Sequence, residues 1–193
     1  MIPLGPADPL PHRPRRVLVA GCSGSGKTTV AAALAVRLGL ARHELDALHH
    51  GPNWTPRPEF AGDVAAFAGS DEWVAEWQYG AVRALLLARA DLLVWLDLPR
   101  WRVAEQLVRR TVRRRLRRIE LWNGNMEPPL WTVFTDRDHI LRWAWTTYPH
   151  TGQRVRAVLA AADRPVVVRL RSRREVRSWF CGPVSAAARS AAP

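Results

Sequence analysis

Residues 16–39, RVLVAGCSGSGKTTVAAALAVRLG, decide the fold of this chain. Residues 16–20 form a short apolar run, which is typical of a buried parallel strand. Residues 27–38 are rich in alanine and leucine and are followed by Gly39, so they predict a mostly buried helix with a glycine cap. Between the two, GCSGSGKT at 21–28 matches G-x-x-x-x-G-K-[ST] in full. The segment therefore predicts a strand, a phosphate-binding loop and a helix in direct succession.

The glycine-rich loop has the composition needed to hold phosphate groups. Its glycines let successive backbone N–H groups point at phosphate oxygens, and the helix that follows adds the positive end of its dipole. In this motif the lysine, Lys27, reaches the β- and γ-phosphates, while the hydroxyl of Thr28 ligates Mg²⁺. The alternative is a strand-to-helix turn without a ligand. We predict that ATP and Mg²⁺ bind here, on Gly21, Ser23, Gly24, Ser25, Gly26, Lys27, Thr28 and Thr29.

The basic residues single out the same loop. The chain has 29 lysines and arginines against 17 acids, a formal net charge of +12, and Lys27 is its single lysine. Its position therefore needs a flexible point charge, which a planar guanidinium does not replace. The excess of arginine also implies attraction to anions, either nucleotides or nucleic acid.

The overall composition indicates one globular domain. The chain has 193 residues, 48% of them hydrophobic and 24% charged, which excludes a wholly disordered or fibrous protein. A chain of this length buries a core without disulfides, and we expect Cys22 and Cys181 to stay unpaired. No apolar run approaches the ~20 residues of a membrane span, and the first residues lack the apolar block of a signal peptide. We therefore expect a cytoplasmic protein with no membrane partner.

Strand and helix patterns alternate along the chain. Apolar runs predict further strands at 43–46, 72–77, 91–97 and 165–170. Helices are predicted at 59–69, 81–90, 100–119, 136–148, 151–162 and after Ser172, which forms a capping box with Glu175. This alternation predicts an α/β fold with three α/β/α layers and a parallel five-stranded sheet. We expect a disordered, proline-rich leader over 1–14, a single domain over 15–180 and a loose tail over 181–193.

Acids end several predicted strands, at the edge where ligands bind in such sheets. Asp46 ends the second strand and could hold metal-bound water or act as a base on an acceptor hydroxyl, although capping a loop is an alternative. Glu76 ends the third strand and is a candidate for the metal-associated acid, with Thr28 as the hydroxyl ligand. Asp97 closes the fourth strand and is another candidate for that acid, but in Asp97-Leu98-Pro99 it could equally cap the next helix.

The predicted helix at 100–119 is rich in arginine. Its apolar positions step by three or four and predict a buried face of Trp101, Ala104, Val108, Val112, Leu116 and Ile119. Arginines form two rows on the other faces, Arg109, Arg113 and Arg117 in one and Arg110, Arg114 and Arg118 in the other. A solvated basic face is the simplest interpretation. The catalytic interpretation is a lid, at about 109–134, whose Arg109, Arg113 and Arg117 neutralise charge during transfer, and a nucleic-acid patch is a third.

Several blocks together resemble a known bacterial family. They are GCSGSGKTT, LDALHHGPNWTP, WVAEWQY, WLDLPR, the arginine-rich helix and ELWNGNMEP. The combination resembles P-loop proteins described as adenylate kinase-like or as DNA topology modulation proteins, over most of residues 15–180. The resemblance implies a nucleoside- or nucleotide-kinase-like fold with an arginine-bearing lid. Two positions depart from it: residues 76–79 read EWQY where the family has an Asp-Gly-Asn-Tyr type of block, and Met126 stands where a lysine or arginine is usual.

These observations favour an ATP- and Mg²⁺-dependent small-molecule phosphotransferase. Its acceptor would lie near Asp46, His49, Trp54 and Tyr79; His49 and His50 have no partners at zinc-ligand spacing, so we read them as loop or acceptor contacts. The alternative is an NTPase that couples hydrolysis to nucleic-acid binding through the arginine-rich helix. A regulatory nucleotide-binding module is a third class. The size of the chain favours the kinase, since it leaves no second domain for motor work.

Overall fold

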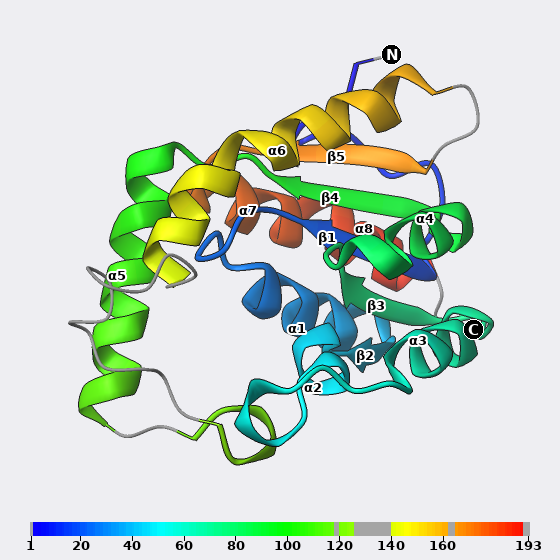
Figure 1. Ribbon diagram of the computed structural model, residues 1–193. Coiled ribbons are helices and arrows are strands. Elements are labelled where there is room, and N and C mark those ends of the chain that lie inside the picture. The colour runs from blue at the N-terminus through cyan, green and yellow to red at the C-terminus, as the bar shows by residue number, and fades with distance from the viewer. Residues whose placement is uncertain (1, 118–119, 126–139, 162–164, 191–193) are drawn as a thin grey trace.

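The computed structural model describes residues 2–117, 120–125, 140–161 and 165–190, with the backbone alone for 140–147 (Figure 1). Five parallel strands form one sheet in the order β2-β3-β1-β4-β5. Their bounds are β1 Arg16–Ala20, β2 Ala41–His43, β3 Trp73–Glu76, β4 Leu92–Leu96 and β5 Val166–Leu170. Strand β1 lies at the centre, paired with β3 on one side and β4 on the other. The predicted α/β class and parallel five-stranded sheet are confirmed.

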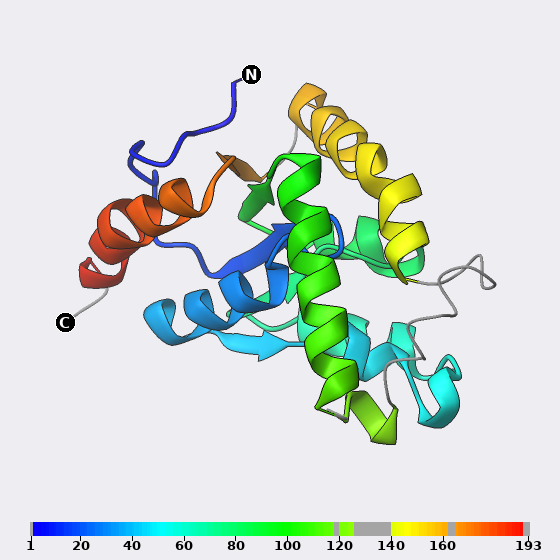
Figure 2. The same ribbon diagram turned by 90° about the vertical axis from the view of Figure 1, so that its left-hand side faces the viewer.

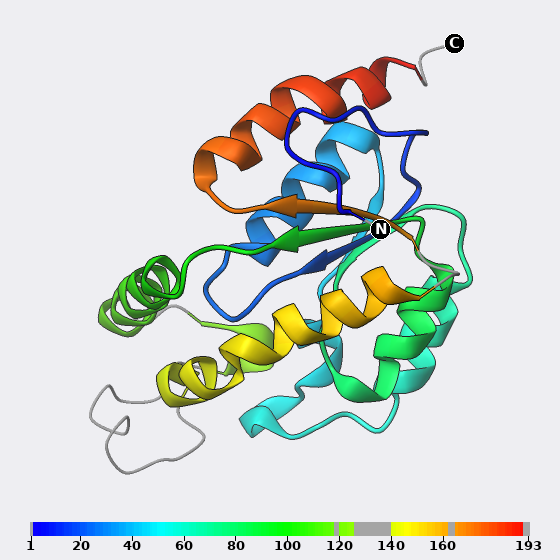
Figure 3. The same cartoon turned by 90° about the horizontal axis from the view of Figure 1, so that it is seen from above.

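Helices cover both faces of this sheet, as the view from above in Figure 3 shows. Helices α2 (Leu45–His49), α3 (Phe60–Ala68), α4 (Gly80–Arg89) and α6 (Ile140–Ala160) supply the residues packed on one face. On the other face lie α1 (Lys27–Leu38), α7 (Arg173–Trp179), the π-helical turn η4 (Phe180–Val184) and α8 (Ser185–Arg189). Helix α5 (Arg100–Leu116) stands apart from both layers and crosses the edge at which the strands end (Figure 2). Two 3-10 turns complete the fold, η1 (Pro52–Trp54) and η2 (Trp122–Gly124).

The central strand shows why the sheet is buried on both sides. Leu18 and Ala20 belong to the core on the α3/α4/α6 face, whereas Val17 and Val19 belong to the core on the α1/α7 face. All four are fully buried. A continuous apolar run is therefore needed, because successive side chains of a strand point to opposite faces.

The helix that follows the phosphate-binding loop forms as the sequence predicts. Helix α1 spans Lys27–Leu38, and Gly39 ends it with φ at +68°, its N–H bonded to the carbonyl of Ala35. The predicted capping box also forms at the start of α7, where Ser172 accepts a hydrogen bond from the N–H of Glu175.

One helix, α6, stands where the sequence predicted two separated near Pro149. Pro149 lies within this helix, which continues because Val155 and Val158 beyond it bury against the sheet. The predicted start of the first of these helices, at residues 136–139, lies outside the described residues. None of the helices in the described part of the chain has the length and apolar character of a membrane span.

Both ends of the chain differ from expectation. Residue Leu4, in the segment expected to be a disordered leader, bridges β5: its N–H bonds to Val167 O at 2.8 Å, and the N–H of Arg169 bonds to Leu4 O at 2.9 Å. The expected loose tail is helical up to Arg189, with Val184 and Ala187 buried. Alanine-rich sequence favours helix, and burial beside α1 gives that helix a place to pack.

Helix α5 turns a different face to the molecule from the one predicted. It ends at Leu116, and three of the predicted buried residues, Trp101, Val108 and Leu116, are 61%, 46% and 76% exposed. The buried residues are instead Val103, Leu107 and Thr111. The predicted Ile119 lies outside the described residues.

Candidate functional site

The glycine-rich loop lies at the carboxyl end of the central strand β1. Gly24 and Gly26 have φ of +85° and +94°, a backbone conformation that favours glycine. Gly26 is the N-cap of α1 and makes no side-chain cap, so the first turn of the helix keeps backbone N–H groups for a ligand. Ser25 is buried, with 5% of its surface exposed, and its hydroxyl has no hydrogen-bond partner in the described structure. These are the features of an anion-binding loop.

Helix α5 packs directly on this loop. A Cβ placed on Gly24 would lie 2.9 Å from Leu107 Cβ and 3.0 Å from the carbonyl oxygen of Val103. The contact explains why α5 buries Val103 and Leu107 rather than the predicted apolar row. The corrected face of α5 is therefore the one that meets the phosphate-binding loop.

Glu76 contacts Lys27 and Thr28, the last two residues of the glycine-rich motif. Thr28 Oγ1 donates a hydrogen bond to Glu76 Oε1 at 2.7 Å, and Lys27 Nζ lies 3.8 Å from Glu76 Oε2. Lys27 also donates to the carbonyl of Cys22 at 3.4 Å. Both members of the ion pair are buried, at 9% and 6% exposure. The structure thus brings together Lys27, Thr28 and Glu76, which the sequence assigned to phosphate and metal binding.

Asp46 occupies a different element from the one predicted. Strand β2 ends at His43, and Asp46 lies in the first turn of α2. Its Oδ1 accepts hydrogen bonds from Gln78 Nε2 at 2.7 Å and from Tyr79 Oη at 2.6 Å. Burial, followed by the charge of Asp46, raises the pKa of Tyr79, so the phenol stays protonated and remains a donor.

Aromatic and imidazole rings surround this carboxylate. His49 stacks on Tyr79 with centroids 4.2 Å apart, and His50 meets the edge of Trp54 at 5.1 Å. Burial and the neighbouring His50 lower the pKa of His49, against the opposing effect of Asp46. Of the predicted acceptor-side residues, Tyr79 therefore contacts Asp46 directly, His49 stacks on Tyr79, and Trp54 contacts the neighbouring His50.

Two motifs that the sequence showed separately contact each other. The Trp54 N–H bonds to Asn125 Oδ1, and Asn125 Nδ2 bonds to the carbonyl of Gly51, both at 2.9 Å. Trp122 Nε1 donates to Glu44 Oε2 at 2.8 Å, and Asn123 Nδ2 donates to the carbonyl of His50. The turn at 121–125 is thereby docked on the acceptor-side segment 44–54. We name this contact the turn dock. The spacing of the two motifs along the sequence does not predict it.

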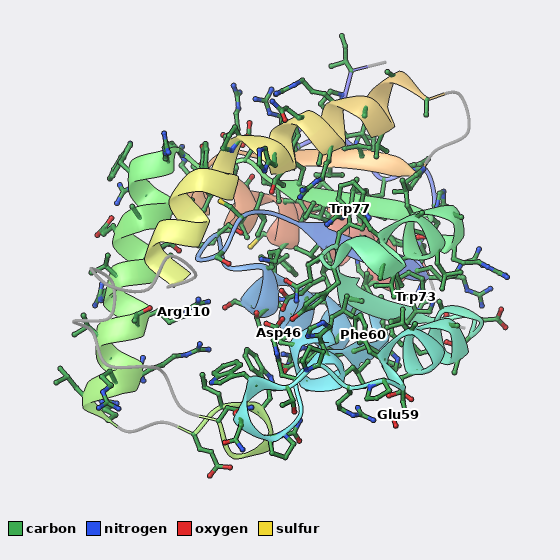
Figure 4. The ribbon with its side chains drawn as sticks, viewed as in Figure 1. Asp46, Glu59, Phe60, Trp73, Trp77 and Arg110 are labelled. Atoms are coloured by element: carbon green, nitrogen blue, oxygen red, sulfur yellow. The ribbon has the colours of Figure 1, made fainter. Side chains whose placement is uncertain are left out.

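The arginine row predicted to act on the phosphates is exposed to solvent. Arg109, Arg113 and Arg117 are exposed, whereas Arg110 and Arg114 of the second row are half-buried. Figure 4 shows Arg110 extending from α5 toward the side of the molecule that holds Asp46. The difference follows from the corrected face of α5, because Arg110 and Arg114 flank the buried Thr111. Arg118, the third member of the second row, lies outside the described residues.

Asp97 belongs to a different interaction. Its Oδ2 accepts a hydrogen bond from Arg169 Nε at 2.8 Å, and the guanidinium of Arg169 also lies over the ring of Trp95. The N-cap of α5 is Pro99 rather than Asp97. The carboxylate therefore joins β4 to β5, and Glu76 is the acid placed beside Thr28.

Comparison with known proteins identifies the fold. No protein-family model and no curated protein matches the sequence. A gluconokinase structure from Sinorhizobium meliloti 1021 is 21% identical, with a TM-score of 0.51, over 93% of this chain and 96% of that one. A sugar kinase structure from Janibacter sp. HTCC2649 is also 21% identical, with a TM-score of 0.50, over 90% and 96%. The chain therefore has a P-loop kinase-like fold, whereas the adenylate kinase-like or DNA topology modulation family is not confirmed.

Proposed function

We propose that this chain is a small-molecule phosphotransferase that moves the γ-phosphoryl group of ATP to a hydroxyl of an acceptor held beside Asp46. The proposal rests mainly on the contacts made by residues 76–79. Glu76 contacts Lys27 and Thr28 of the phosphate-binding loop, and Gln78 and Tyr79 donate to Asp46. One short segment thus links the loop to a second carboxylate that is oriented by two donors. A second, oriented carboxylate can act as the general base for the hydroxyl of an acceptor.

The residues of the loop fit ATP and Mg²⁺. The unpartnered Ser25 hydroxyl, the uncapped start of α1 and the buried Lys27 form a cradle for anionic oxygens. Loop amides and Lys27 would hold the phosphates, and Thr28 would hold Mg²⁺ with Glu76 acting through bound water. Bound Mg²⁺ neutralises charge on the phosphates and fixes their orientation.

The remaining steps belong to residues of the chain. Asp46 takes the proton of the acceptor hydroxyl on Oδ2, which receives no hydrogen bond from the described part of the chain. The acceptor oxygen then forms its bond to phosphorus as the bond from phosphorus to the ADP oxygen breaks. Lys27 and Arg110 offset the charge that builds on the phosphoryl and leaving oxygens.

The comparisons support a polyhydroxylated acceptor as the first class to test. The two structures compared above are a gluconokinase and a sugar kinase. The resemblance to adenylate kinase-like proteins adds nucleosides and nucleotides to the set. Fold similarity does not by itself transfer a substrate, so the acceptor has to be found by assay.

One observation favours a second candidate function, an NTPase coupled to nucleic acid. Arg109 and Arg113 of α5 and Arg117, its C-cap, are exposed, and the described structure shows no ion pair for them. Such exposed cations suit phosphate backbones. This candidate requires that DNA or RNA stimulate ATP turnover, with an affinity that falls steeply as salt rises.

A screen of ADP release from ATP·Mg²⁺ tests the proposal. The acceptors are gluconate, neutral sugars, nucleosides, nucleotides and small alcohols, with duplex DNA and RNA as separate arms. We expect one acceptor to raise turnover far above hydrolysis, Lys27→Ala to abolish it, and Asp46→Asn to lower kcat by roughly 10²–10⁴ with ATP affinity retained. Stimulation by nucleic acid alone would favour the second candidate. Unchanged turnover in Lys27→Ala would refute both.

A further inference from the structure

A chain of hydrogen bonds runs away from Asp46 through three neighbouring side chains. Tyr79 Oη lies 2.6 Å from Asp46 Oδ1 and 3.1 Å from His50 Nε2. His50 Nδ1 in turn lies 3.5 Å from His49 Nδ1. The chain therefore reads Asp46, Tyr79, His50, His49, and it includes both histidines of the HHG sequence, whose role the proposed reaction leaves unassigned.

The chemistry of the groups fixes the direction of this chain. An ionised carboxylate only accepts, so Tyr79 commits its one hydroxyl proton to Asp46. The Tyr79 oxygen can then only accept from His50, which must carry its proton on Nε2. A neutral His50 of that tautomer has a lone pair on Nδ1, and its contact with His49 is a hydrogen bond only if His49 Nδ1 is the donor. Every member thus donates toward Asp46.

Contacts other than these hydrogen bonds also hold the rings in place. His49 stacks on Tyr79 and meets the edge of Phe60 at 4.8 Å, and His50 meets the edge of Trp54. The turn dock fixes the backbone of the same residue, because Asn123 Nδ2 donates to the carbonyl of His50. A ring held in this way keeps Nε2 facing Tyr79.

We propose that His50 is a positioning residue which, as its Nε2–H tautomer, keeps the Tyr79 proton on Asp46 and leaves Asp46 Oδ2 open to the acceptor hydroxyl. The inference rests on the proposed function for its catalytic consequence, but not for the chain itself. With the other tautomer, His50 would present a lone pair to Tyr79. The one hydroxyl proton of Tyr79 would then be shared between Asp46 Oδ1 and His50 Nε2, which weakens one of the two hydrogen bonds that orient the carboxylate.

Nitrogen-15 NMR of the imidazole rings tests this chain of hydrogen bonds without any nucleotide or acceptor. The protein has six histidines, and loss of one signal set in His50→Gln assigns the signals of His50. At pH 8 we expect His50 to carry its proton on Nε2 in the unmodified protein and to become a mixture of tautomers in Tyr79→Phe. His12→Gln, at an exposed position, is the control that should leave the His50 signals unchanged. A proton on Nδ1 of His50, or no response to Tyr79→Phe, would overturn the proposal.

Two amide substitutions test the catalytic consequence, with ATP·Mg²⁺ as the probe and water as the acceptor. The glutamine of His50→Gln places its N–H near the former Nε2 and should keep turnover within about twofold. The shorter asparagine of His50→Asn cannot reach Tyr79 and should lower turnover about tenfold, as should Tyr79→Phe, which is the size of one hydrogen bond to a charged group. Equal turnover in His50→Gln and His50→Asn would overturn the proposal, provided that both bind ATP and unfold as the unmodified protein does. If Lys27→Ala keeps its turnover, the proposed function fails while the NMR result still decides the chain.

Discussion

Glu76 reaches two partners from the end of β3, and this reach depends on the length of its side chain. One carboxylate oxygen accepts from Thr28 while the other faces Lys27. An ion pair this deeply buried is stable only when both charges are compensated, and the hydroxyl of Thr28 supplies the additional bond. Glu76 stands where the adenylate kinase-like proteins that the sequence resembles have the shorter aspartate, and its contacts with Thr28 and Lys27 accommodate the longer side chain.

Gly24 is the residue at which the phosphate-binding loop meets α5. We predict that Gly24→Ala lowers the free energy of unfolding by about 1–3 kcal/mol, because the new Cβ meets Leu107 Cβ at 2.9 Å and φ is +85°. Chemical denaturation measures this change. Gly62→Ala is the matched control: Gly62 lies in α3 with open space around it, so alanine should stabilise by about 0.5–1 kcal/mol. Equal stability of the two variants would contradict the contact between loop and helix.

At the scale of elements, the sequence predicted α1, its glycine cap and four of the five strands, because each follows from a local apolar period or a cap. The second strand was predicted at 43–46, but β2 spans Ala41–His43 and residues from Leu45 form α2. The sequence also placed the wrong face of α5 in the interior. The predicted residues Trp101, Val108 and Leu116 are all large and apolar, but the helix turns Val103, Leu107 and Thr111 inward to meet the loop. Periodicity predicts where a helix lies in the sequence. Which of its faces is buried depends on the element that packs on it, here the phosphate-binding loop, and the local sequence does not show that element.

The corrected face of α5 predicts different roles for two adjacent arginines. Arg110→Ala should lower kcat/KM for ATP-dependent transfer by roughly one to two orders of magnitude, because Arg110 extends toward the side of Asp46 (Figure 4). Arg109→Ala should change it by less than about twofold, since Arg109 is exposed. Both substitutions are on the same helix and remove the same charge, so steady-state kinetics of the pair separates position from charge. A larger loss in Arg109→Ala would restore the row that the sequence predicted.

At the scale of the whole molecule, the turn dock joins segments more than 70 residues apart. Sequence showed both of its motifs, but the distance between them along the chain carries no information about contact. The same holds for the two ends, where a short leader pairs with β5 and an alanine-rich tail packs as helix. These contacts depend on the assembled sheet, and composition alone predicted loose ends.

Asn125 is the central residue of the turn dock. It is 5% exposed, accepts from the Trp54 N–H and donates to the carbonyls of Gly51 and Trp122. Asn125→Ala leaves these backbone groups without their partner, so we predict a loss of about 1–3 kcal/mol in the free energy of unfolding. Urea unfolding measures it. Gln153→Ala on the exposed side of α6 removes an amide of no such role and should have little effect.

Glu72 ties the N-terminal segment to the body of the domain in a pH-dependent way. Its Oε1 accepts from Arg13 at 2.6 Å and from Arg15 at 3.2 Å, and Arg13 also donates to the carbonyl of Leu38. These bonds lower the pKa of Glu72 below the unfolded value near 4.5. A carboxyl whose folded-state pKa is lowered stabilises the protein above its unfolded value, and this stabilisation is lost as the pH falls through the folded value.

Glu72→Gln should therefore lower the free energy of unfolding at pH 7 by about 0.5–1 kcal/mol, the usual size for a pair at the surface. The difference from the unmodified protein should shrink as the pH is lowered below about 4.5, where Glu72 itself loses its charge. Urea unfolding at a series of pH values from 7 to 3.5 measures both. Glu105→Gln is the control, because its pair with Arg102 is more than half exposed and ties no distant segments together. A difference that grows on acidification would show that the charge of Glu72 does not stabilise the folded protein through its pairs with Arg13 and Arg15.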